Sequence, residues 1–152
     1  MARTKTTASA APASEEVCEA FPADWTDIRG HAEIISRLRA LAAAKRLPHA
    51  LLFCGIEGVG KRRTAHVLVR TLLCETAGDV PCGHCGACRT MAAGVHPDYF
   101  EVAPEARGKS AAMIRTDAVR DILVAASGAP VSADRRIILI DGADRMNETA
   151  AN

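Results

Sequence analysis

Residues 49–65, HALLFCGIEGVGKRRTA, decide how the rest of this 152-residue chain is interpreted. They follow the P-loop pattern G-x-x-x-x-G-K-[ST], in which a strand leads through a glycine-rich turn into a helix. The apolar run at 50–54 predicts the strand, and a helix is expected to begin near Lys61. Backbone N–H groups of such a turn point at phosphate, and the lysine adds a positive charge. The candidate phosphate-binding residues of this loop are Gly55, Gly58, Gly60 and Lys61.

The residue after the lysine departs from the pattern. Ser or Thr is expected there, because its hydroxyl holds Mg²⁺, but the chain has Arg62. A guanidinium has no lone pair to offer a metal ion. We therefore expect the architecture of a nucleotide-binding site without its usual metal chemistry, and nucleotide binding itself stays open. Arg62 either forms an ion pair with Asp141 or faces a phosphate directly.

The stretch IILIDGAD at 137–144 predicts a second motif of the same kind. In P-loop ATPases an apolar strand ends in an aspartate that supports Mg²⁺, and Asp141 fits that role, although a plain strand-end carboxylate is the alternative. The acidic residue that would polarise the attacking water is replaced by Gly142. Because the metal ligand and the acidic residue are lost in separate motifs, we expect no ATP hydrolysis and assign no catalytic residue.

Four cysteines predict a metal site at 74–90. The spacing Cys74-x7-Cys82-x2-Cys85-x2-Cys88 allows four thiolates to surround a structural Zn²⁺. A redox CxxC pair and unrelated buried thiols are the alternatives. Six cysteines without a secretory signal favour reduced thiols in a cytosol.

Composition restricts the partners and the compartment. The net charge of +1 gives no global electrostatic reason to bind nucleic acid, so DNA contacts would need a local patch or partner subunits. No apolar run approaches the ~20 residues that span a bilayer, so we expect a cytoplasmic protein without membrane contact. Residues 1–22, rich in Ala, Ser and Thr, are expected to form a disordered leader.

The remaining pattern alternates helices with strands. Helices are expected at 31–46 and from 116 or 117, with strands at 98–102 and 137–141. The second strand is continuously apolar, as is typical of a central parallel strand that is covered on both faces. This alternation predicts an α/β domain at 23–152 with a parallel sheet flanked by helices. We also expect the domain to be truncated, because the chain stops inside a helix that starts near Asn147.

The order of these motifs, over about residues 25–152, resembles the bacterial clamp-loader subunits of the AAA+ superfamily. Within that family the chain is similar to the delta-prime type of DNA polymerase III more than to the gamma/tau motor, which would keep Ser or Thr at 62 and an acidic residue at 142. The stretches that carry the resemblance are His49-Ala50-Leu51-Leu52, Gly60-Lys61-Arg62, Pro81-Cys82-Gly83-His84-Cys85, His96-Pro97-Asp98-Tyr99, Asp117-Ala118-Val119-Arg120 and Asp141-Gly142-Ala143-Asp144.

The resemblance implies a five-stranded parallel AAA+ sheet with a protruding zinc module, followed by a lid and a helical collar. It implies a non-motor stator of a pentameric ring that opens the sliding clamp and places it on primed DNA during DNA replication. The implied partners are the gamma/tau and delta subunits, with the clamp indirectly and primed DNA through the assembly. The holoenzyme is a DNA-directed DNA polymerase, a nucleotidyltransferase. Two other interpretations stay open: an active gamma/tau-like ATPase that tolerates Arg62, and a zinc-centred DNA-binding or redox module.

Overall fold

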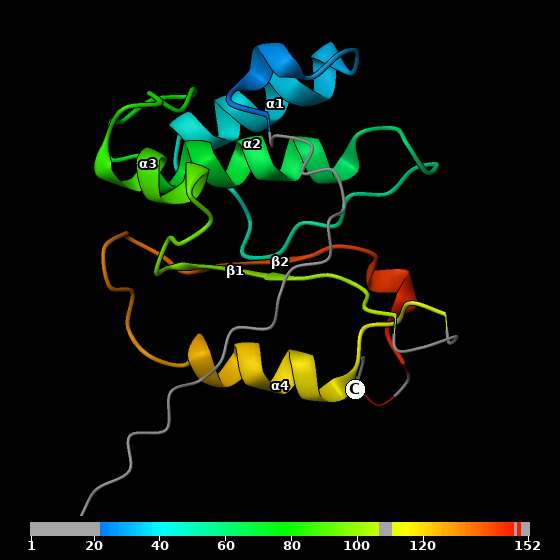
Figure 1. Ribbon diagram of the computed structural model, residues 1–152. Helices are drawn as coiled ribbons and strands as arrows, with labels where there is room; N and C mark the ends of the chain where they lie inside the picture. The colour runs from blue at the N-terminus through cyan, green and yellow to red at the C-terminus, as the bar shows by residue number, and fades with distance from the viewer. Residues whose placement is uncertain (1–21, 107–110, 148, 150–152) are drawn as a thin grey trace, which may run out of the picture.

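Helices lie on both sides of a pair of parallel strands in the computed structural model, which describes residues 22–106, 111–147 and 149 (Figure 1). Helices α1 and α2 lie on one side of the strands and α4 lies on the other. The expected leader at 1–22, apart from its last residue, and most of the helix expected from Asn147 onward fall outside the described residues.

The first two helices form the hydrophobic core. α1 runs over Ala32–Ala43 and α2 over Lys61–Leu73, which confirms the helices predicted in these two regions. A short 3₁₀ helix, η1, at Trp25–Asp27 precedes α1 and places the indole of Trp25 in this core. The buried members of the cluster are Trp25, Ile35, Leu38, Ala42, Val67 and Leu68.

The two strands pair in parallel. β1 spans Tyr99–Val102 and β2 spans Ile137–Ile140, and the register runs from Tyr99 opposite Ile137 to Val102 opposite Ile140. Helix α4, at Thr116–Ala125, lies between the two strands in the chain and contacts β1. Parallel strands need such a crossover because the chain must return to the same end of the sheet. The predicted strand–helix–strand order is therefore confirmed.

The sheet is smaller than expected, and two predictions about it were wrong. Residues 50–54 form no strand, and Leu51 and Leu52 are 43% and 80% exposed. β2 has one neighbour in the described chain, and Ile138 and Ile140 on one of its faces are 37% and 39% exposed, so β2 is neither central nor covered on both faces. An apolar run becomes a strand only when another backbone pairs with it. The described residues supply no such partner for 50–54, so the expected five-stranded sheet is not present among them.

The cysteine region contains a short helix that the sequence pattern did not predict. α3 spans Gly86–Ala92 and packs against α2. Cys85 caps it, because its sulfur accepts a hydrogen bond from the backbone N–H of Cys88 at 3.4 Å. A second 3₁₀ helix, η2, at Ala143–Arg145 follows β2.

Candidate phosphate-binding loop and cysteine cluster

The loop at 55–60 has the backbone that a glycine-rich turn requires. Gly58 and Gly60 have φ angles of +77° and +92°, and Gly60 is the N-cap of α2 in the left-handed region. Residues other than glycine rarely adopt positive φ angles, because their Cβ clashes with the backbone. The loop therefore ends directly at the N-terminus of α2, where the unpaired N–H groups of the first turn lie.

Lys61 closes this loop on itself. Its Nζ donates hydrogen bonds to the carbonyl oxygens of Gly55 at 2.9 Å and Ile56 at 2.8 Å. The ammonium group is thus held over the start of the loop, and the sequence-predicted residues Gly55, Gly58, Gly60 and Lys61 form one local structure. Their predicted contact with phosphate remains a prediction.

Arg62 lies between two carboxylates, one on β1 and one directly after β2. Its Nε and Nη2 donate to Oε1 of Glu101 at 3.1 and 2.8 Å, and its Nε lies 3.5 Å from Oδ2 of Asp141. The first of the two arrangements expected for Arg62, an ion pair with Asp141, is therefore present. The guanidinium also joins the first turn of α2 to β1, which the sequence did not predict.

Glu101 is the functional candidate that sequence reasoning missed. It belongs to no motif, and its only signal is an acidic residue within the otherwise apolar and aromatic strand YFEV. The Tyr99 hydroxyl donates to its Oε2 at 2.9 Å, and Nε2 of His66 lies 3.4 Å from its Oε1. Burial alone would raise the pKa of Glu101, but His66, the Tyr99 hydroxyl and the Arg62 charge together lower it to about 2. Glu101 is therefore an anion across the physiological pH range.

Tyr99 is held in the same group. Its ring lies edge-on to the ring of His66, with the two centroids 5.9 Å apart. Burial and the adjacent Glu101 carboxylate raise the pKa of the Tyr99 hydroxyl well above its usual range. Tyr99 is therefore a neutral hydrogen-bond donor that fixes Glu101.

Asp141 and Gly142 lie where β2 ends. The backbone N–H of Asp141 donates to the carbonyl of Val102 at 2.8 Å, which places both residues at the carboxyl end of the strands. Gly142 has a φ of +67°, and a Cβ built on it would lie 3.0 Å from Cγ of Pro104. An acidic side chain at 142 would be both strained and crowded. The backbone at position 142 therefore favours glycine.

The four predicted cysteines come together. The Sγ atoms of Cys74, Cys82, Cys85 and Cys88 all lie within 4.8 Å of one another. The Cys74–Cys85 and Cys82–Cys88 sulfur distances are 3.9 and 4.0 Å. A tetrahedral Zn²⁺ with bonds of about 2.3 Å places its sulfurs about 3.8 Å apart. The cluster could therefore hold a metal ion.

Backbone N–H groups also point at these sulfurs. Cys82 and Cys85 donate from their backbone nitrogens to the sulfurs of Cys74 and Cys82, each at 3.4 Å. A hydrogen bond from Thr76 and the N–H groups of His84 and Cys85 lower the pKa of the Cys82 thiol to about 5. Burial raises the pKa of Cys88 to about 12. A bound cation would favour the thiolate form of both residues.

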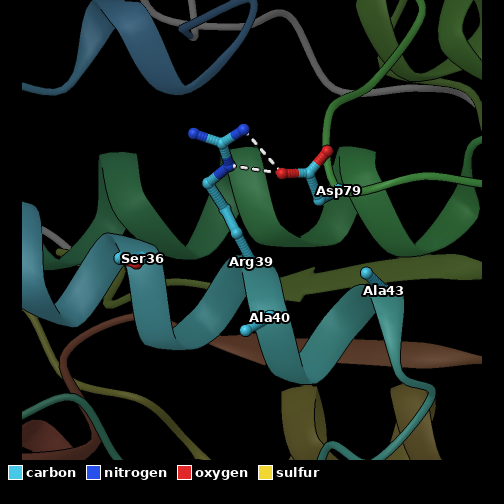
Figure 2. A pocket seen from close by; sticks show the side chains of 5 residues that line it. All are labelled: Ser36, Arg39, Ala40, Ala43 and Asp79. Atoms are coloured by element: carbon cyan, nitrogen blue, oxygen red, sulfur yellow. Dashed lines mark hydrogen bonds and ion pairs between the residues drawn. The ribbon is translucent and has the colours of Figure 1, made fainter.

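A separate hollow of about 360 Å³ lies on α1 (Figure 2). Its wall includes Arg39 and Asp79, which form a hydrogen-bonded ion pair with Nε of Arg39 2.9 Å from Oδ2 of Asp79. The other residues that line it are Ser36, Ala40 and Ala43. The two charges neutralise each other, and the hollow contains none of the predicted site residues.

In the parts of the chain that the structure describes, no helix combines the length and the apolar character needed to cross a membrane.

The chain matches a family model and several curated proteins. Residues 30–152 match the family described as DNA polymerase III, delta subunit. The DNA polymerase III subunit delta' of Pseudomonas aeruginosa is 41% identical over 105 residues, which cover 68% of this chain and 31% of that protein. The subunit delta' of Escherichia coli is 35% identical over 117 residues, covering 76% of this chain and 34% of that protein.

The subunit tau of Escherichia coli is also similar, at 30% identity over 132 residues, which cover 86% of this chain and 20% of that protein. The chain thus spans about a third of the length of the delta' relatives and a smaller share of tau.

Proposed function

The chain belongs to the family of the DNA polymerase III delta subunit, and on this basis we propose that it acts as a delta-prime-like stator of the clamp loader. In that role it helps to place the sliding clamp on primed DNA during replication, as a subunit of a DNA polymerase holoenzyme. The higher identity to the delta' relatives than to tau supports this choice.

The observation that carries the non-motor role is the position of Arg62. Its guanidinium binds Glu101 and Asp141 at the place where a P-loop ATPase has a hydroxyl ligand for Mg²⁺. Gly142 supports the same role, because it has no acidic side chain to polarise a water molecule. Pro104 would crowd an acidic side chain at this position. We therefore propose that the subunit hydrolyses no ATP of its own. Nucleotide binding by Gly55, Gly58, Gly60 and Lys61 is compatible with this absence of hydrolysis.

The cysteine cluster is proposed to hold one structural Zn²⁺. A set of four thiolates leaves no open coordination position, so the metal would stabilise the module at 74–90 and take no part in a reaction. The proposed domain spans 23–152 with this module inserted after α2.

The proposed partners are the other clamp-loader subunits, gamma/tau and delta, with the sliding clamp and primed DNA reached through the assembly. The near-neutral net charge fits DNA contact that depends on the partner subunits. Such a subunit would work in the cytoplasm, where bacterial DNA is replicated.

A gamma/tau-like motor is the second candidate. The similarity to tau extends over a larger share of this chain than the similarity to delta', and the loop with its lysine is retained. In this alternative Arg62 would leave the ion pair when nucleotide and Mg²⁺ bind.

ATP hydrolysis by the complete subunit, alone and assembled with motor subunits, distinguishes the two. For a stator, Lys61→Ala leaves the hydrolysis rate of the assembly unchanged, and the subunit alone is inactive. Mg²⁺-dependent hydrolysis by the subunit alone, abolished by Lys61→Ala, would establish the motor. A failure to join gamma/tau and delta in gel filtration would reject the clamp-loader role itself.

A further inference from the structure

We propose that Arg62 is a built-in cation that takes the place of the divalent metal ion in this P-loop and keeps Mg²⁺ out. This inference rests on the non-motor role proposed above, and it explains how the P-loop would exclude a divalent metal ion. It concerns Arg62, Glu101 and Asp141, and assigns Glu101 as the second anionic partner.

The guanidinium of Arg62 contacts both carboxylates at once. One atom, Nε of Arg62, lies 3.1 Å from a Glu101 oxygen and 3.5 Å from an Asp141 oxygen, and Nη2 of the same guanidinium lies 2.8 Å from Glu101. Glu101 lies on β1, Asp141 directly follows β2, and Arg62 comes from the first turn of α2. One positive group therefore binds one anion on β1 and a second directly after β2.

The two carboxylates suit a guanidinium as well as they suit a divalent metal ion. Mg²⁺ is usually bound in nucleotide sites through one or two carboxylates together with substrate phosphates. Here a permanently charged guanidinium holds two carboxylates beside a phosphate-binding loop, and it needs no lone pair from position 62. A metal ion would have to displace Arg62 before it could reach both oxygens.

Glu101, an anionic partner of Arg62, is itself held in place by its neighbours. Glu101 accepts a hydrogen bond from the Tyr99 hydroxyl at 2.9 Å, and His66 lies beside it with a side chain that is 4% exposed. Glu101 therefore cannot turn away to solvent without losing these contacts. The arrangement favours a closed ion-pair group over a site that opens when metal is added.

Mn²⁺ is a suitable probe, because its bound and free forms are distinguished by electron paramagnetic resonance. The complete subunit, with zinc in its cysteine cluster, is titrated with Mn²⁺ in the absence of nucleotide. The wild type is expected to show no Mn²⁺ binding that depends on Asp141. Arg62→Thr is expected to gain one site, at least tenfold tighter than any wild-type binding, and Asp141→Asn in the Arg62→Thr background is expected to remove it.

Arg62→Lys and Arg62→Met are the matched controls. Lysine keeps a positive charge and is expected to leave the site closed, whereas methionine has similar length without charge and is expected to open it. Methionine also serves as a second test if Arg62→Thr does not fold. Wild-type Mn²⁺ binding that Asp141→Asn abolishes would overturn the proposal, as would the failure of both neutral variants to gain a site while their circular dichroism stays native. Assembly with the other subunits is measured separately, so the stator role can survive the loss of this inference.

Discussion

The carboxylate of Asp98 lies 2.7 Å from the backbone nitrogen of Ser132, so a side chain just before β1 holds the loop that leads into β2. The same carboxylate accepts hydrogen bonds from the backbone N–H groups of Val131 at 2.7 Å and Ala133 at 2.9 Å, and it is fully buried. The carbonyl of Asp98 also accepts from the N–H of Ile137, the first residue of β2. Asp98 therefore sets the position of β2, the strand that Asp141 directly follows.

Asp98→Asn is expected to destabilise the fold. The amide keeps the shape but loses the charge that three N–H groups share, and one of its ends presents a donor to other donors. We expect the melting temperature to fall by about 5 °C or more, measured by circular dichroism. Asp134→Asn, at an exposed carboxylate nearby in the chain, is the control and should change it little. Equal effects of the two substitutions would contradict the role of Asp98.

Stability is expected to fall in acid through Glu101. The pKa of Glu101 is lowered from 4.5 to about 2 in the folded chain, so the unfolded chain binds the proton more readily. Its contribution is therefore fully present above the unfolded pKa and is lost as the pH falls through the folded one. Urea denaturation at pH values from 7 to 2 measures this. Glu101→Gln should remove this part of the decline below about pH 4.5, and an unchanged slope in that variant would contradict the assignment.

Metal removal is expected to loosen the cysteine module. The purified complete protein should carry close to one zinc per chain, and a chelator should make the region 74–90 sensitive to protease. Cys82→Ser should lose the metal. Cys54→Ser, at an exposed thiol outside the cluster, is the matched control and should keep it. Metal-free protein with unchanged protease resistance would contradict the zinc proposal.

Trp25 is expected to matter more to stability than Arg39, although both interact with Asp79. The indole Nε1 of Trp25 donates to the Asp79 carbonyl at 2.8 Å from a buried position. Trp25→Phe should therefore cost about 1–2 kcal/mol of unfolding free energy. The Arg39–Asp79 ion pair is 39% and 43% exposed, so Arg39→Ala should cost less than about 1 kcal/mol. Denaturant unfolding followed by circular dichroism compares them, and a larger loss for Arg39→Ala would reverse this ranking.

Local pattern predicted most of the described elements. The apolar spacing located α1, α2 and α4, and the glycines with Lys61 located the start of α2. The Cys spacing predicted which sulfurs meet, because tight turns between 82 and 88 bring three of them together over a few residues. Each of these features depends on residues that are near one another in the chain.

Pairing over long distances was decided only by the tertiary structure. Whether residues 50–54 form a strand and whether β2 is covered depend on partners elsewhere in the chain that an apolar run does not specify. The sequence by itself established that position 62 has no hydroxyl for a metal ion. It could not show that Glu101, 39 residues away, would bind the guanidinium, because only the tertiary structure brings the first turn of α2 next to β1.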